Sequence, residues 1–250
     1  MEIRDSTSPP PVVLDVGSGS GSWAIEMGSS YPQAQILGVD LVIDRDLHAP
    51  SNVQFKQLDI TKGLPSVDRG YAIIHARVVT GHLKDPSVFV QAAYAALAPG
   101  GLLILCDACK PLWGDNSAPI PLIPGIHVPN DAPTAGSWWV GWMDVWFRTA
   151  YKHYRPVDEL IKEHHELSLV HQERYLVPTH EFNDDEARPG LGAISNSILL
   201  GFCRGVVDTL LATGQFTRSQ IDEWITLIEK EFETKPIYMT WDVACGVKSS

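Results

Sequence analysis

Hydrophobic and polar positions in the first hundred residues alternate between short strand-like runs and longer helix-like segments. Four apolar runs and one period-two alternation predict five strands, at 12–16, 36–40, 53–58, 71–76 and 102–106. Helices are predicted at 22–30 and from Pro86, with Asp85 as its N-cap, to about Ala98. Strands separated by helix-length connections indicate a parallel sheet with helices on both faces.

The second half of the chain begins with a segment of different character. Residues 110–136 contain six prolines and little periodicity, which indicates a long loop or lid. An aromatic-rich helix is predicted directly after it, at 137–154. We therefore expect one domain, residues 1–250, with an inserted lid at 110–155.

Two helical stripes and two strands complete the expected fold. A four-residue spacing predicts a buried helical face at Ile194, Ile198, Phe202, Val206 and Leu210. A capping box of Thr217 with Gln220 precedes a second stripe, formed by Ile221, Trp224, Ile225, Ile228 and Phe232. Strands are predicted at 167–178 and 237–247. The fold class is therefore α/β, a doubly wound, mostly parallel sheet of seven strands.

Composition narrows the class of protein. Of 250 residues, 44% are hydrophobic and 20% charged, which is typical of a globular chain. The formal net charge of −11 disfavours nucleic acid and membrane surfaces as partners. No apolar run reaches the roughly eighteen residues that a membrane span needs. The first eleven residues lack the apolar core of a signal peptide, so a cytoplasmic location is expected.

The glycine-rich segment between the first strand and the first helix is the clearest chemical motif. It reads Asp15-Val16-Gly17-Ser18-Gly19-Ser20-Gly21, and Ser22 stands where a dinucleotide motif has its third glycine. A carboxylate two positions before Gly17 suits an ammonium group better than a pyrophosphate. S-adenosylmethionine carries an ammonium and a sulfonium and no phosphate, so the pattern favours this cofactor over NAD.

Two further aspartates end neighbouring strands at the edge where such sheets bind ligands. Asp40 ends the second strand, where a carboxylate accepts hydrogen bonds from ribose hydroxyls. Asp59 follows the third strand, where a carboxylate can accept from an adenine amino group. The alternative is that each aspartate only caps a strand or helix, but the register with the glycine loop favours a nucleoside site.

These residues resemble the class I S-adenosylmethionine-dependent methyltransferases, and within them the LaeA-like fungal subgroup of secondary metabolism. The subgroup resemblance rests on Trp23-Ala24, Tyr31-Pro32, His75-Ala76-Arg77 and Leu97-Ala98-Pro99-Gly100-Gly101. It implies a Rossmann-like methyltransferase fold and a small-molecule substrate. It also implies a cofactor site made of Asp15, Gly17, Ser18, Gly19, Gly21, Asp40, Leu41, Asp59, Ile60, Ala76 and Arg77.

Two departures from the family pattern stand out. Family members usually carry helices before the glycine motif, whereas eleven residues precede Val12 here. Either the chain is a truncated form or the inserted segments take over the role of those helices. The acidic residue often found early in the fourth strand is Ala72 in this chain.

Candidates for catalysis and substrate binding lie in the segments after the strands. His82 follows the fourth strand and is the candidate general base, with a helix-capping or surface histidine as the alternative. His127 in the proline-rich segment is a weaker candidate. Trp138, Trp142 and Trp146 share one helical face, which forms either a core or an aromatic wall for a flat hydrophobic substrate.

Metal or redox chemistry is not indicated. Cys106-Asp107-Ala108-Cys109 is a single CxxC without a second pair, and Glu163-His164-His165-Glu166 lacks the HExxH spacing. We therefore expect no metal site.

The main hypothesis is a methyltransferase acting on a small, aromatic or hydrophobic metabolite. A regulatory protein that keeps the fold, with a protein partner or as a homodimer, is the first alternative. Non-methylating chemistry on the same fold, such as cyclisation, is the second.

Overall fold

The computed structural model describes residues 9–44, 46–114, 136–180, 190–235 and 237–249. Its contacts divide the chain into two compact units. Unit 1 consists of Met1–Asp107, Arg155–Glu173 and Asp242–Ser250, and unit 2 of Ala108–Tyr154 and Arg174–Trp241. The sequence analysis expects one domain with a lid at 110–155. That expectation stays a prediction. Each of the two units has a hydrophobic core of its own, and unit 2 also contains the helices after residue 190.

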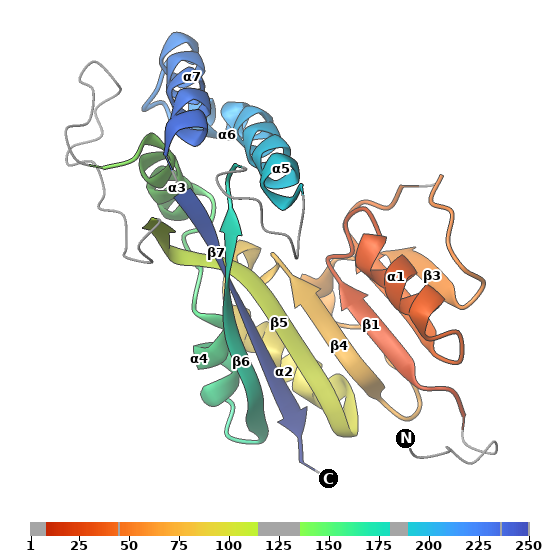
Figure 1. The fold of residues 1–250 in the computed structure, drawn as a ribbon. Helices are drawn as coiled ribbons and strands as arrows, with labels where there is room; N and C mark the ends of the chain where they lie inside the picture. Colours follow the sequence, from red (N-terminus) through yellow and green to blue (C-terminus); the bar gives the residue numbers. More distant parts are fainter. Residues whose placement is uncertain (1–8, 45, 115–135, 181–189, 236, 250) are drawn as a thin grey trace. The chain divides into compact units, whose positions relative to one another are not determined.

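Seven strands form one sheet in the order β3-β2-β1-β4-β5-β7-β6. Strands β1 to β5 are parallel, and the arrow of β7 points the opposite way (Figure 1). This is the predicted doubly wound, mostly parallel architecture. The bounds are β1 Val12–Val16, β2 Gln35–Asp40, β3 Val53–Gln57, β4 Tyr71–Arg77, β5 Leu97–Gly114, β6 Leu167–Pro178 and β7 Ile237–Lys248.

Helices of unit 1 lie on both faces of the sheet (Figure 1). Helix α1, Ser22–Ser30, covers one face of β1, β2 and β3, where Val13, Ile36 and Val53 form a small core with Ala24. Helices α2, Pro86–Ala96, and α4, Val157–Lys162, cover the opposite face over the larger core. Helix α2 starts as predicted, because the side chain of Asp85 accepts the Ser87 N–H.

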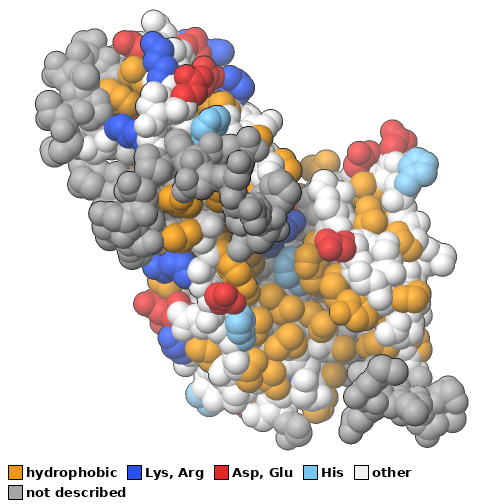
Figure 2. Space-filling model, in the orientation of Figure 1, with side chains coloured by type: hydrophobic (Ala, Val, Ile, Leu, Met, Phe, Trp, Pro, Cys, Tyr) orange, Lys and Arg blue, Asp and Glu red, His pale blue; other side chains and the backbone are white. Residues whose placement is uncertain are grey.

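The α1 face of the sheet is less covered at β4 and β5. Ile73, Leu102 and Ile104 are only partly buried there, whereas Leu103 and Leu105 on the α2 face have no exposed surface. Figure 2 shows hydrophobic side chains gathered over these strands.

Unit 2 is built around an aromatic core. Its helices are α3 Trp138–Thr149, α5 Leu191–Gly205, α6 Val207–Ala212 and α7 Arg218–Thr234. The predicted capping box of Thr217 with Gln220 starts α7, and the predicted stripe behind it is buried. Buried Glu231 of α7 accepts hydrogen bonds from the Ser137 hydroxyl (2.8 Å) and the Trp139 N–H (2.9 Å) at the start of α3. A carboxylate at this helix N-terminus is favourably placed in the field of the helix dipole.

The prediction of a buried face on α5 is wrong for the first two residues of the stripe. Ile194 and Ile198 are 60% and 64% exposed, and the helix is interrupted at Val206. The buried positions of α5 are instead Gly192, Ser195, Leu199 and Cys203, because the core of unit 2 lies on that side. Four-residue spacing identifies a stripe, but the neighbouring elements decide which stripe is buried.

The sequence analysis also finds no segment that could cross a membrane. In the described residues, Leu191–Ala212 is long and apolar enough by length and composition, with a mean hydropathy of 1.3. Arg204 and Asp208 lie in this stretch, but its mean hydropathy stays high enough to meet the criterion for a membrane span. One such stretch is weak evidence for a span, because core helices of soluble proteins meet the same criterion.

Candidate cofactor site

The glycine loop after β1 is fixed to the end of β2 by backbone hydrogen bonds. The N–H groups of Gly17 and Ser18 both donate to the Val39 carbonyl, at 2.8 and 3.0 Å. Gly17, Gly19 and Gly21 have φ angles of 67°, 52° and 74°, in the left-handed region that glycine adopts without strain. The loop therefore turns sharply from β1 into α1 at the carboxyl edge of the sheet, where such sheets bind ligands.

Asp40 at the end of β2 holds the tip of this loop. Its Oδ2 accepts the Gly19 N–H at 2.8 Å, and its Oδ1 accepts the Val42 N–H at 3.2 Å. A carboxylate has about four lone-pair positions, so two remain for hydroxyl donors. Both predicted residues thus lie together, with the carboxylate oriented by the backbone.

The space above the loop is suited to a ligand. A Cβ atom added to Gly19 would meet no atom within 4 Å, whereas one on Gly17 would lie 2.5 Å from Val79 Cγ2. The Ser18 hydroxyl is buried without a hydrogen-bond partner among the described residues. The open glycine and the oriented carboxylate fit a nucleoside with polar substituents.

Asp15 lies beneath the loop in a buried cluster. It is 2% exposed, and its Oδ1 is 2.8 Å from Nδ1 of His75, which is 4% exposed. The two residues are register partners on the adjacent parallel strands β1 and β4. Trp23 of α1 stacks on the imidazole, with ring centroids 3.9 Å apart and planes 10° apart. The sequence analysis uses Trp23 and His75 only as markers of a subgroup and misses this contact.

Asp59 caps the short helix η1, Ile60–Lys62, as the alternative interpretation of this residue supposes. Its Oδ1 accepts the N–H and the hydroxyl of Thr61, at 3.0 and 2.6 Å, and Lys62 Nζ lies 3.2 Å from Oδ2. The Thr61 hydroxyl and N–H, with Lys62, lower the pKa of Asp59. A role at the adenine would use the lone pairs that remain.

The side chains of the other predicted cofactor residues differ in their exposure, and therefore in whether they can contact a ligand. Leu41 is 62% exposed, and Ile60 packs partly against the main core of unit 1. Ala76 is buried with its side chain in that core, so any ligand contact there is through its backbone. Arg77 is exposed at the end of β4. It is followed by Val78, which has a φ of 58°, a strained conformation for a β-branched residue.

His82 ends the short helix η2, Thr80–His82, which directly follows β4. The segment is anchored because the Thr80 hydroxyl donates to buried Asp107 Oδ2 at 2.7 Å. Val79, at the start of this turn, packs against Gly17 of the glycine loop. The His82 residue is exposed, but partial desolvation lowers the pKa of its imidazole, which favours the neutral form that a general base requires.

The three predicted aromatic substrate residues lie in α3 of unit 2. Trp142 has no exposed surface and packs edge-on against Trp224, with centroids 5.3 Å apart. Trp146 packs edge-on against Phe202, and the Trp138 carbonyl accepts the Trp224 indole N–H at 3.0 Å. These positions favour the core interpretation, most clearly for Trp142. His127 lies outside the described residues.

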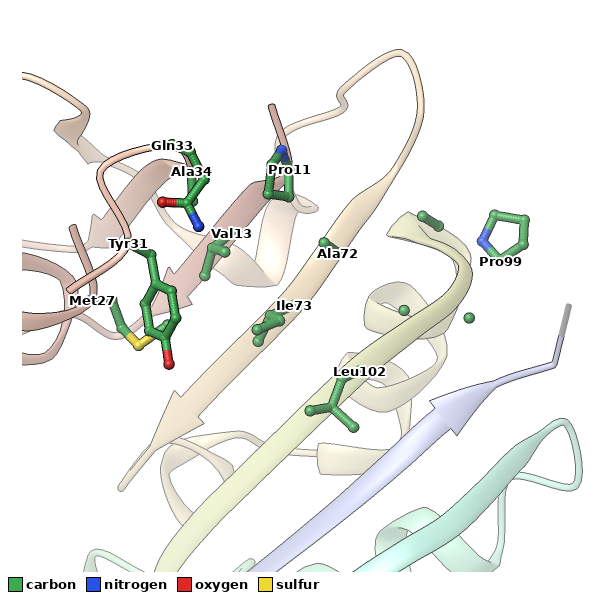
Figure 3. A pocket seen from close by; sticks show the side chains of 13 residues that line it. Pro11, Val13, Met27, Tyr31, Gln33, Ala34, Ala72, Ile73, Pro99 and Leu102 are labelled. Atoms are coloured by element: carbon green, nitrogen blue, oxygen red, sulfur yellow. The ribbon is translucent and has the colours of Figure 1, made fainter. Parts of the chain in front are cut away.

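A cavity of about 670 Å³ opens at the other end of the same strands. It is lined by residues at the starts of β1 and β4, including Val13 and Ile73, together with Tyr31 after α1 and Gly100 and Leu102 of β5 (Figure 3). The glycine loop follows the carboxyl end of β1, so this cavity is separate from the candidate cofactor site.

Burial raises the pKa of the Cys106 thiol on β5 to about 11, which makes it a poor nucleophile at neutral pH.

The chain belongs to the methyltransferase domain family, whose model matches residues 2–180. This match, together with the relatives described below, confirms the predicted class: a methyltransferase that uses S-adenosylmethionine.

Three relatives illustrate the similarity. Methyltransferase str2 of Strobilurus tenacellus is 26% identical over 242 residues, which cover 94% of this chain and 80% of that protein. Methyltransferase pytC of Aspergillus terreus is 38% identical over 106 residues, covering 42% of this chain and 32% of the relative. The secondary metabolism regulator laeA of Coprinopsis cinerea is 26% identical over 183 residues, covering 70% of this chain and 44% of the regulator. The matched region therefore spans less than half the length of pytC and of laeA.

Solved structures share the fold. Phosphoethanolamine N-methyltransferase 2 of Haemonchus contortus aligns with a TM-score of 0.51 at 15% identity, covering 98% of this chain and 50% of that protein. The cyclase SpnF aligns with a TM-score of 0.54 at 15% identity, covering 98% of this chain and 77% of that protein. At these identities the likeness shows the architecture alone.

Proposed function

We propose that this protein transfers a methyl group from S-adenosylmethionine to a small, aromatic or hydrophobic metabolite in the cytoplasm. The observation that carries the proposal is the contact between the glycine loop and Asp40. The Gly19 N–H to Asp40 hydrogen bond orients a carboxylate beside open space at the carboxyl edge of the sheet. The match to methyltransferases str2 and pytC supports the same activity.

The residues of unit 1 would hold the cofactor in the following way. The remaining lone pairs of Asp40 would accept the ribose hydroxyls, and those of Asp59 the adenine amino group. The open backbone at Gly19 would lie against the ligand. Asp15 beneath the loop would pair with the methionine ammonium group. When bound, S-adenosylmethionine supplies an electrophilic methyl group on its sulfonium.

The protein's part in the transfer is mainly to position the acceptor and to exclude water. A general base is needed only if the acceptor atom keeps its proton near neutral pH. The lowered pKa of His82 suits that role, and its segment is fixed beside the glycine loop through Val79. Trp138 and Trp146 of unit 2 are partly buried, and a substrate role for these two rings stays a prediction.

Calorimetry with S-adenosylhomocysteine tests the cofactor site. The wild-type protein should bind it, and Asp40→Ala should weaken binding by about 100-fold, since hydrogen bonds to a charged group contribute about 1.5–3 kcal/mol each. Asp68→Ala is the matched control, because this exposed aspartate precedes β4 at the opposite edge of the sheet. Absence of binding to the wild type, or equal affinity in both variants, would contradict the proposed site.

The activity itself is tested by incubation with a panel of aromatic and aliphatic metabolites and detection of products by mass spectrometry. A mass increase of one methyl group that requires the cofactor supports the proposal. A product of unchanged mass would instead support rearrangement or cyclisation on this fold.

A regulatory role is the second candidate, favoured by the match to laeA over 70% of this chain. It predicts cofactor binding without turnover and a stable protein partner. Multiple turnovers of methyl transfer to an isolated small molecule would exclude regulation as the main function.

A further inference from the structure

The buried cluster of Asp15, His75 and Trp23 is more ordered than packing alone requires. Three elements contribute one residue each: β1, β4 and α1. The strand register places Asp15 and His75 side by side, and the stack of Trp23 on the imidazole fixes the plane of that ring. Both polar members are almost fully buried, where a charged group is costly unless it is hydrogen-bonded.

The hydrogen bond determines the state of the imidazole. A carboxylate is only an acceptor, so Nδ1 of His75 carries the hydrogen and donates it to Asp15 Oδ1 at 2.8 Å. The bond occupies one carboxylate oxygen and prevents rotation of the group. Among the described residues, Oδ2 of Asp15 has no recorded hydrogen-bond partner.

Asp15 lies two residues before Gly17, directly below the loop proposed to hold the cofactor. Resting on that proposed function, we propose that His75 is a positioning residue for the amino-acid end of the cofactor. Its Nδ1–H holds Asp15 by Oδ1, and the oriented Oδ2 receives the methionine ammonium group. Trp23 holds the imidazole in the plane that this bond needs.

A purely structural role of the cluster would give a different result from a positioning role. Loss of packing lowers the stability of the protein and lowers the affinity of every ligand of the loop equally. Loss of positioning lowers the affinity only of ligands that carry an ammonium group. S-adenosylhomocysteine carries that group, whereas 5′-methylthioadenosine has the same nucleoside and sulfur but no amino-acid end.

The experiment measures both ligands by calorimetry on the full chain. His75→Phe keeps an aromatic ring against Trp23 and removes the donor. It should reduce the ratio of S-adenosylhomocysteine to methylthioadenosine affinity by about 10- to 100-fold, with methylthioadenosine affinity within about twofold of the wild type. His75→Asn, whose amide reaches the Nδ1 position, should retain most of the ratio. An unchanged ratio in His75→Phe overturns the inference.

Two further comparisons make the result unambiguous. In an Asp15→Ala background, His75→Phe should not change the ratio further, because the residue that His75 orients is gone. If His75→Phe is not folded by circular dichroism, His75→Gln replaces it, since the Gln amide reaches the Nε2 position instead. Equal ratios for His75→Gln and His75→Asn would then refute the role of Nδ1.

The two proposals fail in different ways. If the wild-type protein binds neither ligand, the proposed cofactor site and this inference both fall. If it binds both ligands and the His75 variants leave the ratio unchanged, the cofactor site stands and only the positioning role is refuted.

Discussion

Replacement of Gly19 by alanine separates the ligand-binding role of the glycine loop from its conformational role. Gly19 has a φ of 52°, and a Cβ atom at this position would meet no protein atom within 4 Å. The methyl group therefore causes no clash in the free protein. It projects into the space that we assign to the cofactor.

The two effects are similar in size but are seen in different measurements, one in stability and the other in ligand affinity. An alanine in the left-handed region costs about 1–2 kcal/mol, which lowers Tm by about 2–4 °C per kcal/mol in a chain of this size. A methyl group forced against a bound ligand costs about 1–3 kcal/mol by analogy with overpacked cores. Affinity for S-adenosylhomocysteine should therefore fall by about 10- to 100-fold.

Gly100→Ala is the matched control. Gly100 also has a left-handed φ, 74°, and open space at its Cβ position, but it lies at the start of β5, away from the glycine loop. Both variants should show a similar decrease in Tm by calorimetry, and only Gly19→Ala should lose affinity. If the two variants bind S-adenosylhomocysteine equally, the space above Gly19 is not where the cofactor lies.

Three further outcomes are expected. Val78→Gly should raise the free energy of unfolding in urea by about 1 kcal/mol, because release of the strained φ outweighs the entropy of the added glycine; a lower urea midpoint would contradict this. His82→Gln should lower kcat by about 100-fold. It should also remove the decrease in kcat that the wild type shows below pH 6.5, since partial desolvation lowers the pKa of His82 and only the neutral imidazole accepts a proton. An unchanged kcat would exclude the base role. Glu231→Ala should cost about 2–4 kcal/mol in urea unfolding, because Ser137 and Trp139 lose the buried acceptor that joins α3 to α7. Glu231→Gln keeps an acceptor oxygen and should cost less; equal losses in the two variants would contradict the role assigned to these hydrogen bonds.

Features encoded locally could be predicted from the sequence. The Asp85 cap with Pro86, and the capping box of Thr217 with Gln220, occur as predicted because each needs only residues within one turn. The glycine loop and Asp40 could be placed together because alternating strands and helices indicate a parallel sheet, in which the carboxyl ends of the strands meet at one edge. The same local logic made the capping role of Asp59 an open alternative, and the structure shows that cap.

Features that depend on neighbouring elements could not be predicted. Ile194 and Ile198 have the spacing of a buried stripe, but α5 presents a different side to the core of unit 2. The contact of His75 with Asp15 follows from the register of β1 against β4, which no local pattern in either strand specifies. Trp23 and His75 could be recognised as markers of the subgroup, but the stack of one ring on the other could not be predicted.

The order of segments in the two units has a consequence for biosynthesis. Unit 1 is discontinuous, and its final piece, Asp242–Ser250, follows the whole of unit 2. A nascent chain can therefore assemble β1 to β4 early, but the outer part of that sheet stays incomplete until β7 leaves the ribosome. During this interval the edge of β5 that pairs with β7 is unpaired, and an unpaired strand edge favours misassembly until its partner strand arrives.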